Sequence, residues 1–174
     1  RDAYFFANAD ILRVLPQLSD VITPVEWRKD RRSAAKTRTT LQQTRAAMGA
    51  QRLGVIFPSG RLAKRTGLRL VERPWMTSAA SIARKFEVPI IPVHIRARNS
   101  MLFYGLDALH PTLRDITLFH EVLNKARQPF AVTVGAPIPP GVLPTCPDAA
   151  TAALRHICLT LGEDGQNGLS MVKA

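Results

Sequence analysis

Short apolar runs alternate along this chain with longer segments in which apolar residues recur at every third or fourth position. The runs lack the period-two alternation of a half-exposed strand, so they are typical of strands covered on both faces. They predict strands at residues 3–6, 21–25, 53–57, 88–95 and 130–134. Because helical segments lie between these strands, the pattern predicts an α/β fold with a mainly parallel sheet covered by helices.

Four amphipathic helices are expected between and after the strands. The first begins at Ala34 and ends near Gly49, a residue type that commonly stops a helix. A second begins near Pro74, since proline is tolerated in a first helical turn. The third and fourth cover about 113–124 and 149–162. No repeat or linker is visible, so we expect one domain over residues 1–162 and a flexible tail over residues 163–174.

A strong positive charge is the main signal in the composition. The chain holds 24 lysines and arginines against 13 aspartates and glutamates, which gives a formal net charge of +11. The basic residues gather in three clusters, at 28–38, 61–73 and 84–98. Such a field favours an anionic partner: phospholipid headgroups, nucleic acid or an acidic carrier protein. Any one cluster taken singly is equally consistent with a solvated surface.

The rest of the composition argues against several protein classes. No apolar run approaches the roughly 18 residues that a membrane-spanning helix needs. Cys146 and Cys158 have no Cys-x-x-Cys spacing, so they indicate neither a disulfide framework nor a zinc site, and they suit a reducing cytosol. No nucleic-acid motif is recognised, and the aromatic residues lie mostly in apolar segments instead of among basic ones.

Two short motifs carry the functional information. Phe57-Pro58-Ser59-Gly60-Arg61 closes one apolar run, and Val88-Pro89-Ile90-Ile91-Pro92-Val93 forms another. In this order, with a helix between them, they resemble the third and fourth motifs of the glycerolipid acyltransferase superfamily. Residues 98–104 and 113–121 resemble a bacterial branch that includes ornithine-lipid O-acyltransferases and proteins labelled haemolysins. The resemblance extends over about residues 3–140, and it implies an acyltransferase-like fold that lacks its N-terminal elements.

The resemblance assigns substrate-binding roles to several residues. Its third motif binds the acceptor's phosphate or polar head, which implies this role for Phe57, Pro58, Ser59, Gly60 and Arg61. Its fourth motif shapes the acyl or acceptor pocket, which implies that role for Val88, Pro89 and Pro92. Its second motif supplies an arginine; local similarity favours Arg28, whereas the distance from the third motif favours Arg31.

The third motif departs from the family pattern at two positions. Ser59 stands where the family usually has glutamate, so the carboxylate that would contact the headgroup is absent or replaced. Arg61 stands where the family has threonine, and the usual arginine position falls on Leu62. The guanidinium of Arg61 can still bind a phosphate or carboxylate through two parallel hydrogen bonds.

The first motif of the family, Asn-His-x-x-x-x-Asp, supplies the general base and is not found in this chain. We therefore assign no catalytic residue, and expect the chain to be the C-terminal portion of a longer acyltransferase and inactive by itself. His110 and Asp115 match the spacing, but they follow the fourth motif and Pro111 lies beside the histidine, so we interpret the match as a coincidence. His94 is interpreted as a core histidine whose hydrogen bonds are satisfied.

The resemblance implies transfer of a fatty acyl group from acyl-carrier protein or acyl-CoA to the hydroxyl of a lysolipid, either a lyso-ornithine lipid or 1-acyl-glycerol-3-phosphate. We expect no metal and no cofactor beyond the acyl donor. The expected partners are the lysolipid, the donor and an anionic membrane surface, with the protein peripheral at the cytoplasmic face of the bacterial inner membrane. The alternative is a non-catalytic basic domain that binds anionic lipid or nucleic acid.

Overall fold

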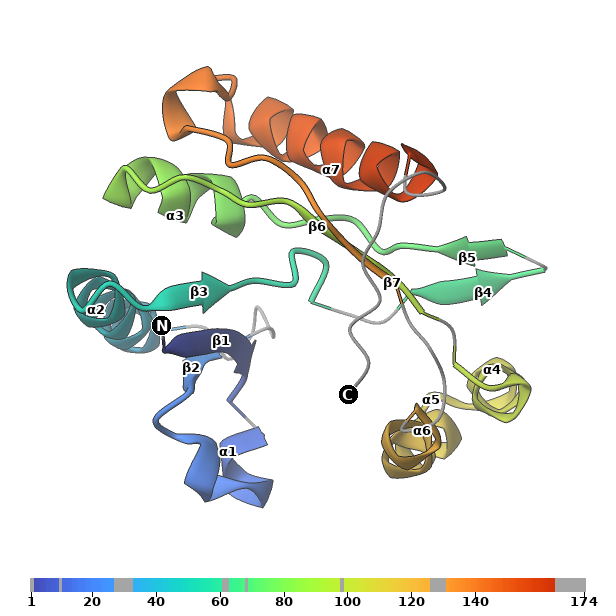
Figure 1. Ribbon diagram of the computed structural model, residues 1–174. Helices are drawn as coiled ribbons and strands as arrows, with labels where there is room; N and C mark the ends of the chain where they lie inside the picture. Colours follow the sequence, from blue (N-terminus) through green and yellow to red (C-terminus); the bar gives the residue numbers. More distant parts are fainter. Residues whose placement is uncertain are drawn as a thin grey trace. The chain divides into compact units, whose positions relative to one another are not determined.

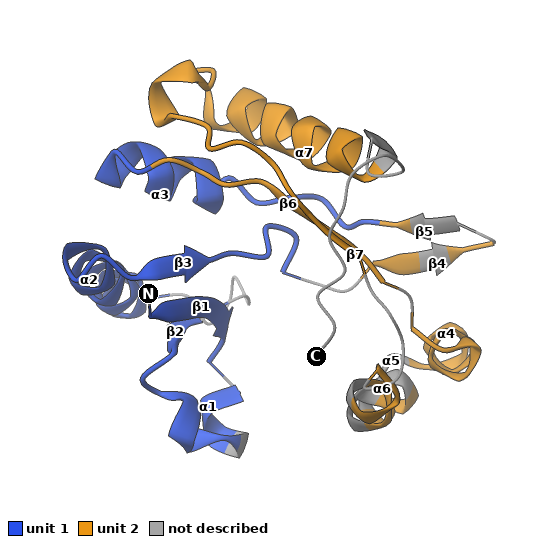
Figure 2. Ribbon diagram, viewed as in Figure 1, with its two compact units in different colours: residues 1–62, 72–88 blue, residues 63–71, 89–174 orange. Residues whose placement is uncertain are grey.

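The computed structural model describes residues 2–9, 11–26, 33–60, 63–67, 69–97, 99–125 and 131–164. The chain divides into two compact units, shown in different colours in Figure 2. Unit 1 comprises Arg1–Leu62 and Glu72–Val88, and unit 2 comprises Ala63–Val71 and Pro89–Ala174. Strands and helices in both units confirm the predicted α/β class. The single domain expected over residues 1–162 stays a prediction, and the tail beyond Asp164 lies outside the described residues.

Unit 1 is built on a three-stranded parallel sheet (Figure 1). Its central strand β1 (Ala3–Asn8) lies between β2 (Ile22–Val25) and β3 (Leu53–Val55), and both neighbours run parallel to it. This arrangement confirms the parallel sheet predicted for the first three apolar runs. The remaining elements of the unit are α1 (Ile11–Val14), the 3-10 helix η1 (Pro16–Leu18), α2 (Ala34–Gly49) and α3 (Ser78–Phe86).

Helix α2 connects β2 to β3 and packs against both strands. It begins where the sequence predicts, because the Ser33 hydroxyl accepts a hydrogen bond from the Lys36 amide at 3.2 Å and caps the first turn. Thr44 is fully buried on its inner face, where its hydroxyl donates to the Thr40 carbonyl at 2.8 Å. Thr40 in turn donates to the carbonyl of Pro24, so the helix is joined to β2 by a hydrogen bond of 2.9 Å.

The ring of Tyr4 lies across β3. Tyr4 is opposite Gly54 in the parallel register, and a Cβ atom added at Gly54 would lie 2.8 Å from the Tyr4 hydroxyl oxygen. The Arg52 guanidinium lies over the same ring, 5.7 Å from its centroid, and donates to the carbonyls of Ala3 and Asp20. Burial raises the pKa of the Tyr4 hydroxyl against the opposing charge of Arg52, and the hydroxyl has no hydrogen-bond partner among the described residues.

Unit 2 contains two antiparallel strand pairs, which the sequence did not predict. The first is the hairpin of β4 (Lys64–Thr66) and β5 (Arg69–Val71), and the second joins β6 (Val93–Arg96) to β7 (Ala131–Val134). Helix α7 (Pro147–Asp164) packs along β6 and β7 (Figure 1). The other elements are α4 (Met101–Leu109), α5 (Pro111–Ile116), α6 (Leu118–Asn124) and the 3-10 helix η4 (Pro140–Val142).

Several predicted boundaries were wrong for identifiable reasons. The strand expected over residues 88–95 is reduced to β6 and one isolated bridge between Ile90 and Ile138, because Pro89 and Pro92 have no amide hydrogen for a continuous ladder. The helix expected over residues 113–124 is divided at Thr117 into α5 and α6. Helix α3 begins at Ser78 instead of Pro74, α7 continues past Gly162, and α4 was not predicted as a helix.

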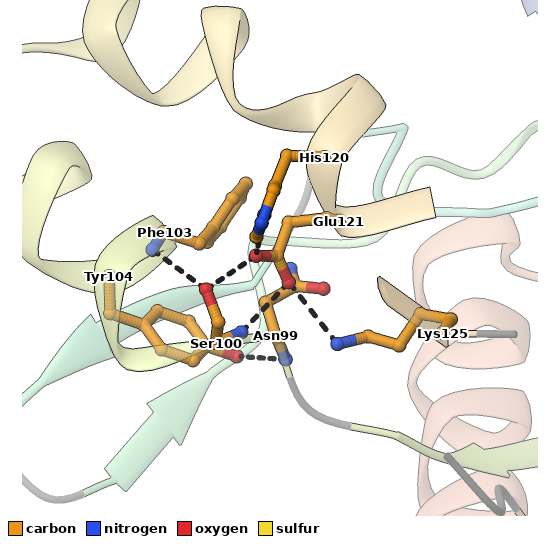
Figure 3. A network of polar contacts seen from close by, with 7 residues as sticks. All are labelled: Asn99, Ser100, Phe103, Tyr104, His120, Glu121 and Lys125. Atoms are coloured by element: carbon orange, nitrogen blue, oxygen red, sulfur yellow. Dashed lines mark hydrogen bonds and ion pairs between the residues drawn. The ribbon is translucent and has the colours of Figure 1, made fainter. Parts of the chain in front are cut away.

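A buried carboxylate joins the start of α4 to α6 (Figure 3). The Glu121 side chain accepts hydrogen bonds from the Ser100 amide at 2.8 Å, from the Ser100 hydroxyl, and from Lys125 Nζ at 3.2 Å. The same Ser100 hydroxyl accepts from the Phe103 amide and caps α4. Burial alone would raise the pKa of Glu121, but the hydrogen bonds from Ser100 and Lys125 outweigh it and lower the pKa to about 2.

Among the residues that the structure describes, no helix is long and apolar enough to cross a lipid bilayer.

Gly54→Ala should destabilise the protein by about 1–3 kcal/mol, because the new methyl group would overlap the buried Tyr4 side chain. Thermal or denaturant unfolding measures this change. Gly105→Ala is the matched control, since a Cβ at Gly105 in α4 meets nothing within 4 Å. Adding Tyr4→Phe to Gly54→Ala should recover part of the lost stability, because it removes the nearest atom. Equal stability of the Gly54→Ala variant and wild type would contradict the close contact between Gly54 and the Tyr4 ring.

Glu121→Gln should lower the free energy of unfolding at neutral pH by roughly 1.5–3 kcal/mol, the usual range for hydrogen bonds to a charged group. The pKa of Glu121 is lowered from 4.5 to about 2, so its stabilisation is present above pH 4.5 and is lost as the pH falls toward 2. The difference between wild type and variant should therefore shrink over that window in denaturant titrations. Glu87→Gln, at an exposed glutamate, is the control; a difference independent of pH would refute the assignment.

Candidate functional site

The chain makes a tight turn shortly after β3. The Gly60 amide donates to the Phe57 carbonyl at 2.9 Å, which places Pro58 and Ser59 at the two central positions of a β-turn. Proline suits the first central position because its φ is preset, and Gly60 has a φ of +59°, in the left-handed region that favours glycine. The structure thus confirms the turn predicted at this motif. Phe57 is 57% exposed, whereas Pro58, Ser59 and Gly60 are half-buried.

The turn is attached to the segment that leads into α3. The Met76 amide donates to the Pro58 carbonyl at 2.9 Å, so this carbonyl is already engaged within unit 1. The indole of the preceding residue, Trp75, donates to the Glu72 carboxylate at 2.8 Å. These contacts give the turn a defined position relative to the start of α3. Sequence reasoning missed Met76, because a backbone hydrogen bond between residues far apart leaves no signal in side-chain identity.

The turn lies beyond the carboxyl ends of the parallel strands, because it follows β3. From β1 the chain connects to β2 on one side, and after α2 it enters β3 on the other side of β1. The strand order therefore reverses at β1, and ligands of open α/β sheets bind outside the carboxyl ends of the strands at such a reversal. The Phe57–Gly60 turn follows the carboxyl end of β3, so its place in the fold is that of a binding loop.

The carboxyl end of β2 belongs to the same edge because β2 is parallel to β3 through β1. Glu26 follows this end and forms an ion pair with Lys36 Nζ at 3.0 Å. Arg28 and Arg31 come next in the sequence, and both lie outside the described residues, as does Arg61. The choice between Arg28 and Arg31 stays open, and the substrate-binding roles of all three arginines stay predictions.

The residues of the fourth family motif, Val88 to Val93, divide between the two units. Val88 closes unit 1, where its amide donates to the Ala83 carbonyl at 3.0 Å after Glu87 turns the chain with a φ of +52°. Pro92 belongs to unit 2 and is buried, and its carbonyl accepts from the Gly135 amide at 2.9 Å. Pro89 is exposed. Their pocket-shaping role stays a prediction.

The histidines whose side chains the structure describes are engaged or exposed, and none is paired with a hydroxyl. His94 is half-buried, with Nδ1 3.0 Å from the Cys158 carbonyl, which supports a structural, hydrogen-bonded histidine at this position. His110 Nδ1 accepts from the Thr112 amide at 3.2 Å and so caps the start of α5. This bond gives His110 a structural role, in agreement with the interpretation of the His110 and Asp115 spacing as a coincidence. His156 is exposed on α7.

The polar network of unit 2 contains a serine, a histidine and a glutamate, but its connections differ from those of a nucleophilic triad. The Ser100 hydroxyl contacts Glu121, whereas the nearest ring nitrogen of His120 lies 3.7 Å from the same carboxylate (Figure 3). A serine nucleophile needs a base such as histidine to take its proton. The network therefore holds helices together and does not activate the serine.

A hollow of about 470 Å³ lies in unit 1, away from the turn. Its lining comes from residues at the amino ends of the strands, including Asp2, Ile22 and Arg52, and from the end of α2. The Arg52 guanidinium is engaged by the carbonyls of Ala3 and Asp20. We therefore place the candidate binding edge at the turn, because ligands of parallel sheets bind at the opposite, carboxyl ends of the strands.

Comparisons with known proteins show the family to which these elements belong. A model of the family described as Acyltransferase matches residues 1–96, which include the whole parallel sheet, the turn and Val88–Pro92. The chain is 23% identical over 136 residues to a lyso-glycine lipid O-acyltransferase of Phocaeicola vulgatus. That alignment covers 75% of this chain and 47% of the relative, so the chain spans about half the length of the curated relative it matches. No solved structure matches the chain.

The family match covers more than half of the chain and contains both motifs that the sequence analysis singled out. It confirms the resemblance stated there to the glycerolipid acyltransferases, with the bacterial relative in agreement. The parallel sheet, the turn after β3 and the family match thus lead to one conclusion: this chain belongs to the acyltransferase family.

Proposed function

We propose that the whole protein transfers a fatty acyl group from an acyl thioester to the hydroxyl of a lysolipid, and that the Phe57–Gly60 turn holds the polar head of that acceptor. The observation that carries the proposal is the position of this turn, at the carboxyl edge of the parallel sheet where the strand order reverses. The same turn lies inside the region that matches the acyltransferase family.

The residues after the turn favour an acceptor whose head carries a negative group. Arg61 follows the turn directly and can form two parallel hydrogen bonds with a carboxylate or phosphate. Arg28 or Arg31, after β2, is proposed as the second cationic contact. Ser59 replaces a glutamate of the family pattern, which removes one negative charge from the same loop.

Two acceptors are consistent with this arrangement, a lyso-ornithine lipid and 1-acyl-glycerol-3-phosphate. We favour the amino-acid lipid, because the relative from Phocaeicola vulgatus is named for a lyso-glycine lipid. The donor is either acyl-carrier protein or acyl-CoA. The net charge of +11 supports an acidic carrier protein as donor and an anionic membrane surface as the place of the reaction, with the protein peripheral at the cytoplasmic face of the inner membrane.

The transfer requires a general base that takes the proton of the acceptor hydroxyl as that oxygen attacks the thioester carbon. Among the described residues, His94 and His110 are engaged in hydrogen bonds within unit 2. We therefore propose that the histidine and aspartate of the base are supplied by a part of the protein outside these 174 residues. The greater length of the relative supports this proposal, since the chain covers 47% of it.

Arg61→Ala in the whole protein should lower kcat/KM for the lysolipid by about tenfold or more, because a charge-assisted contact to the acceptor head is lost. The KM for the acyl donor should remain unchanged. Arg45→Ala is the matched control, since it removes an exposed arginine from α2. Steady-state assays with lyso-ornithine lipid, lyso-glycine lipid and 1-acyl-glycerol-3-phosphate measure these constants and rank the acceptors. Identical kinetics of the two variants on every acceptor would contradict the assignment.

The 174-residue chain by itself should transfer no acyl group, because the proposed base lies outside it. Radiolabelled acyl donor and each lysolipid provide the assay, with the whole protein as the positive control. The His110→Ala variant tests the alternative that His110 is the general base. Acyl transfer by the isolated chain that disappears in this variant would show that His110 is the base, against the structural role assigned to it.

A further inference from the structure

Helix α4 presents a solvent-exposed face that is entirely apolar. Its exposed residues are Met101, Leu102, Gly105, Ala108 and Leu109. At about 100° per residue, these positions fall within an arc of roughly 120° on one side of the helix. Phe103 is on the opposite side and is only 1% exposed. The usual distribution for a surface helix, with polar residues outward, is therefore absent from this described helix.

Further apolar side chains are exposed on the next two helices. Leu113 and Ile116 of α5 and Leu123 of α6 are exposed, and the exposed fractions of Ile116 and Leu123 reach 70% and 76%. Among the described side chains of α4, α5 and α6 that are exposed, none belongs to aspartate, glutamate, lysine or arginine. Since α4 contacts α5 and α5 contacts α6, these exposed apolar side chains gather on neighbouring helices, which is typical of a site of interaction with a protein or a membrane.

The helices that carry this surface are held in place by the Glu121 network. Ser100, at the start of α4, and Lys125, just after α6, both bind the Glu121 carboxylate (Figure 3). The segment thus buries a carboxylate and exposes leucines. Because the capping and hydrogen bonds define the orientation of α4, the outward leucines are part of a folded surface and not of an unstructured end.

We propose that the apolar face of α4–α6, defined by Met101, Leu102, Leu109, Ile116 and Leu123, docks on an anionic membrane surface. Short amphipathic helices lie in the interface plane with their apolar face below the headgroups, and basic residues near them add attraction to anionic lipid. Arg96 is exposed at the end of β6, just before the segment, and the whole chain has a net charge of +11. The inference rests on the proposed function only in that the acceptor is a membrane lipid.

A second copy of this chain is a less suitable occupant of the same face. Two chains that each have a net charge of +11 repel one another, whereas the same charge strengthens binding to anionic lipid. A second copy would also leave the membrane-embedded acceptor without a docking surface on these helices. Self-association is therefore treated as the competing outcome of the experiment.

The test measures binding of the chain to vesicles of phosphatidylcholine with and without phosphatidylglycerol, by co-sedimentation. The double variant Leu102→Ser with Leu109→Ser should bind the anionic vesicles at least about tenfold more weakly than wild type, because two apolar side chains no longer enter the bilayer. Val142→Ser is the matched control, since Val142 is 73% exposed in the same unit but belongs to η4. Its binding should equal that of wild type.

A second measurement reports insertion while a large apolar side chain is kept at position 109. A tryptophan placed by Leu109→Trp should shift its emission to shorter wavelength when anionic vesicles are added, whereas one placed by Val142→Trp should not. Unchanged binding of the serine variant, or no shift at position 109, would overturn the proposal. The proposal would also be overturned if the wild-type chain were a dimer in the absence of vesicles and the serine variant were a monomer. The vesicles contain neither acceptor nor donor, so failure of the acyl-transfer proposal would leave these results unaffected.

Discussion

The contact between the Tyr4 ring and Gly54 determines how the parallel sheet of unit 1 is assembled. Strand β3 pairs with β1 over only three residues, so its backbone hydrogen bonds alone hold it weakly. The absence of a side chain at Gly54 lets the buried ring of Tyr4 cover the strand, and Arg52 covers the ring and binds the backbone carbonyls of Ala3 and Asp20. The Phe57–Gly60 turn starts two residues after β3, so its position depends on this contact.

The two units distribute polar and apolar groups in different ways. In unit 1 the polar groups support the sheet: Thr40 attaches α2 to β2, and Arg52 joins the starts of the strands. In the α4–α6 segment of unit 2 a carboxylate is inside and leucines are outside. Burying Glu121 is tolerated because each of its oxygens is hydrogen-bonded and Lys125 balances its charge. The polar groups of the α4–α6 segment thus pair with one another inside it, while apolar side chains form its exposed surface.

Most of unit 1 could be predicted from the sequence, because its signals are local. The apolar runs, the Ser33 cap of α2 and the proline-glycine turn each depend on neighbours in the chain. A glycine inside an apolar run is also a known sign of close approach, so Gly54 could have indicated the Tyr4 contact. Helix α4 was missed because apolar residues lie on both its exposed side, as Met101 does, and its buried side, as Phe103 does, so no polar face marks the helical period in the sequence.

The sequence by itself determined the α/β class, the turn after β3 and membership of the acyltransferase family, since all three follow from residue types at fixed spacing. The tertiary structure alone decided that β6 pairs with β7 in the antiparallel direction and that Glu121 is buried while Leu109 and Leu123 are exposed. The physical reason is that pairing direction and burial depend on distant partners. The Glu121 carboxylate stays buried because it accepts hydrogen bonds from Ser100, which is 21 residues away and caps the start of α4.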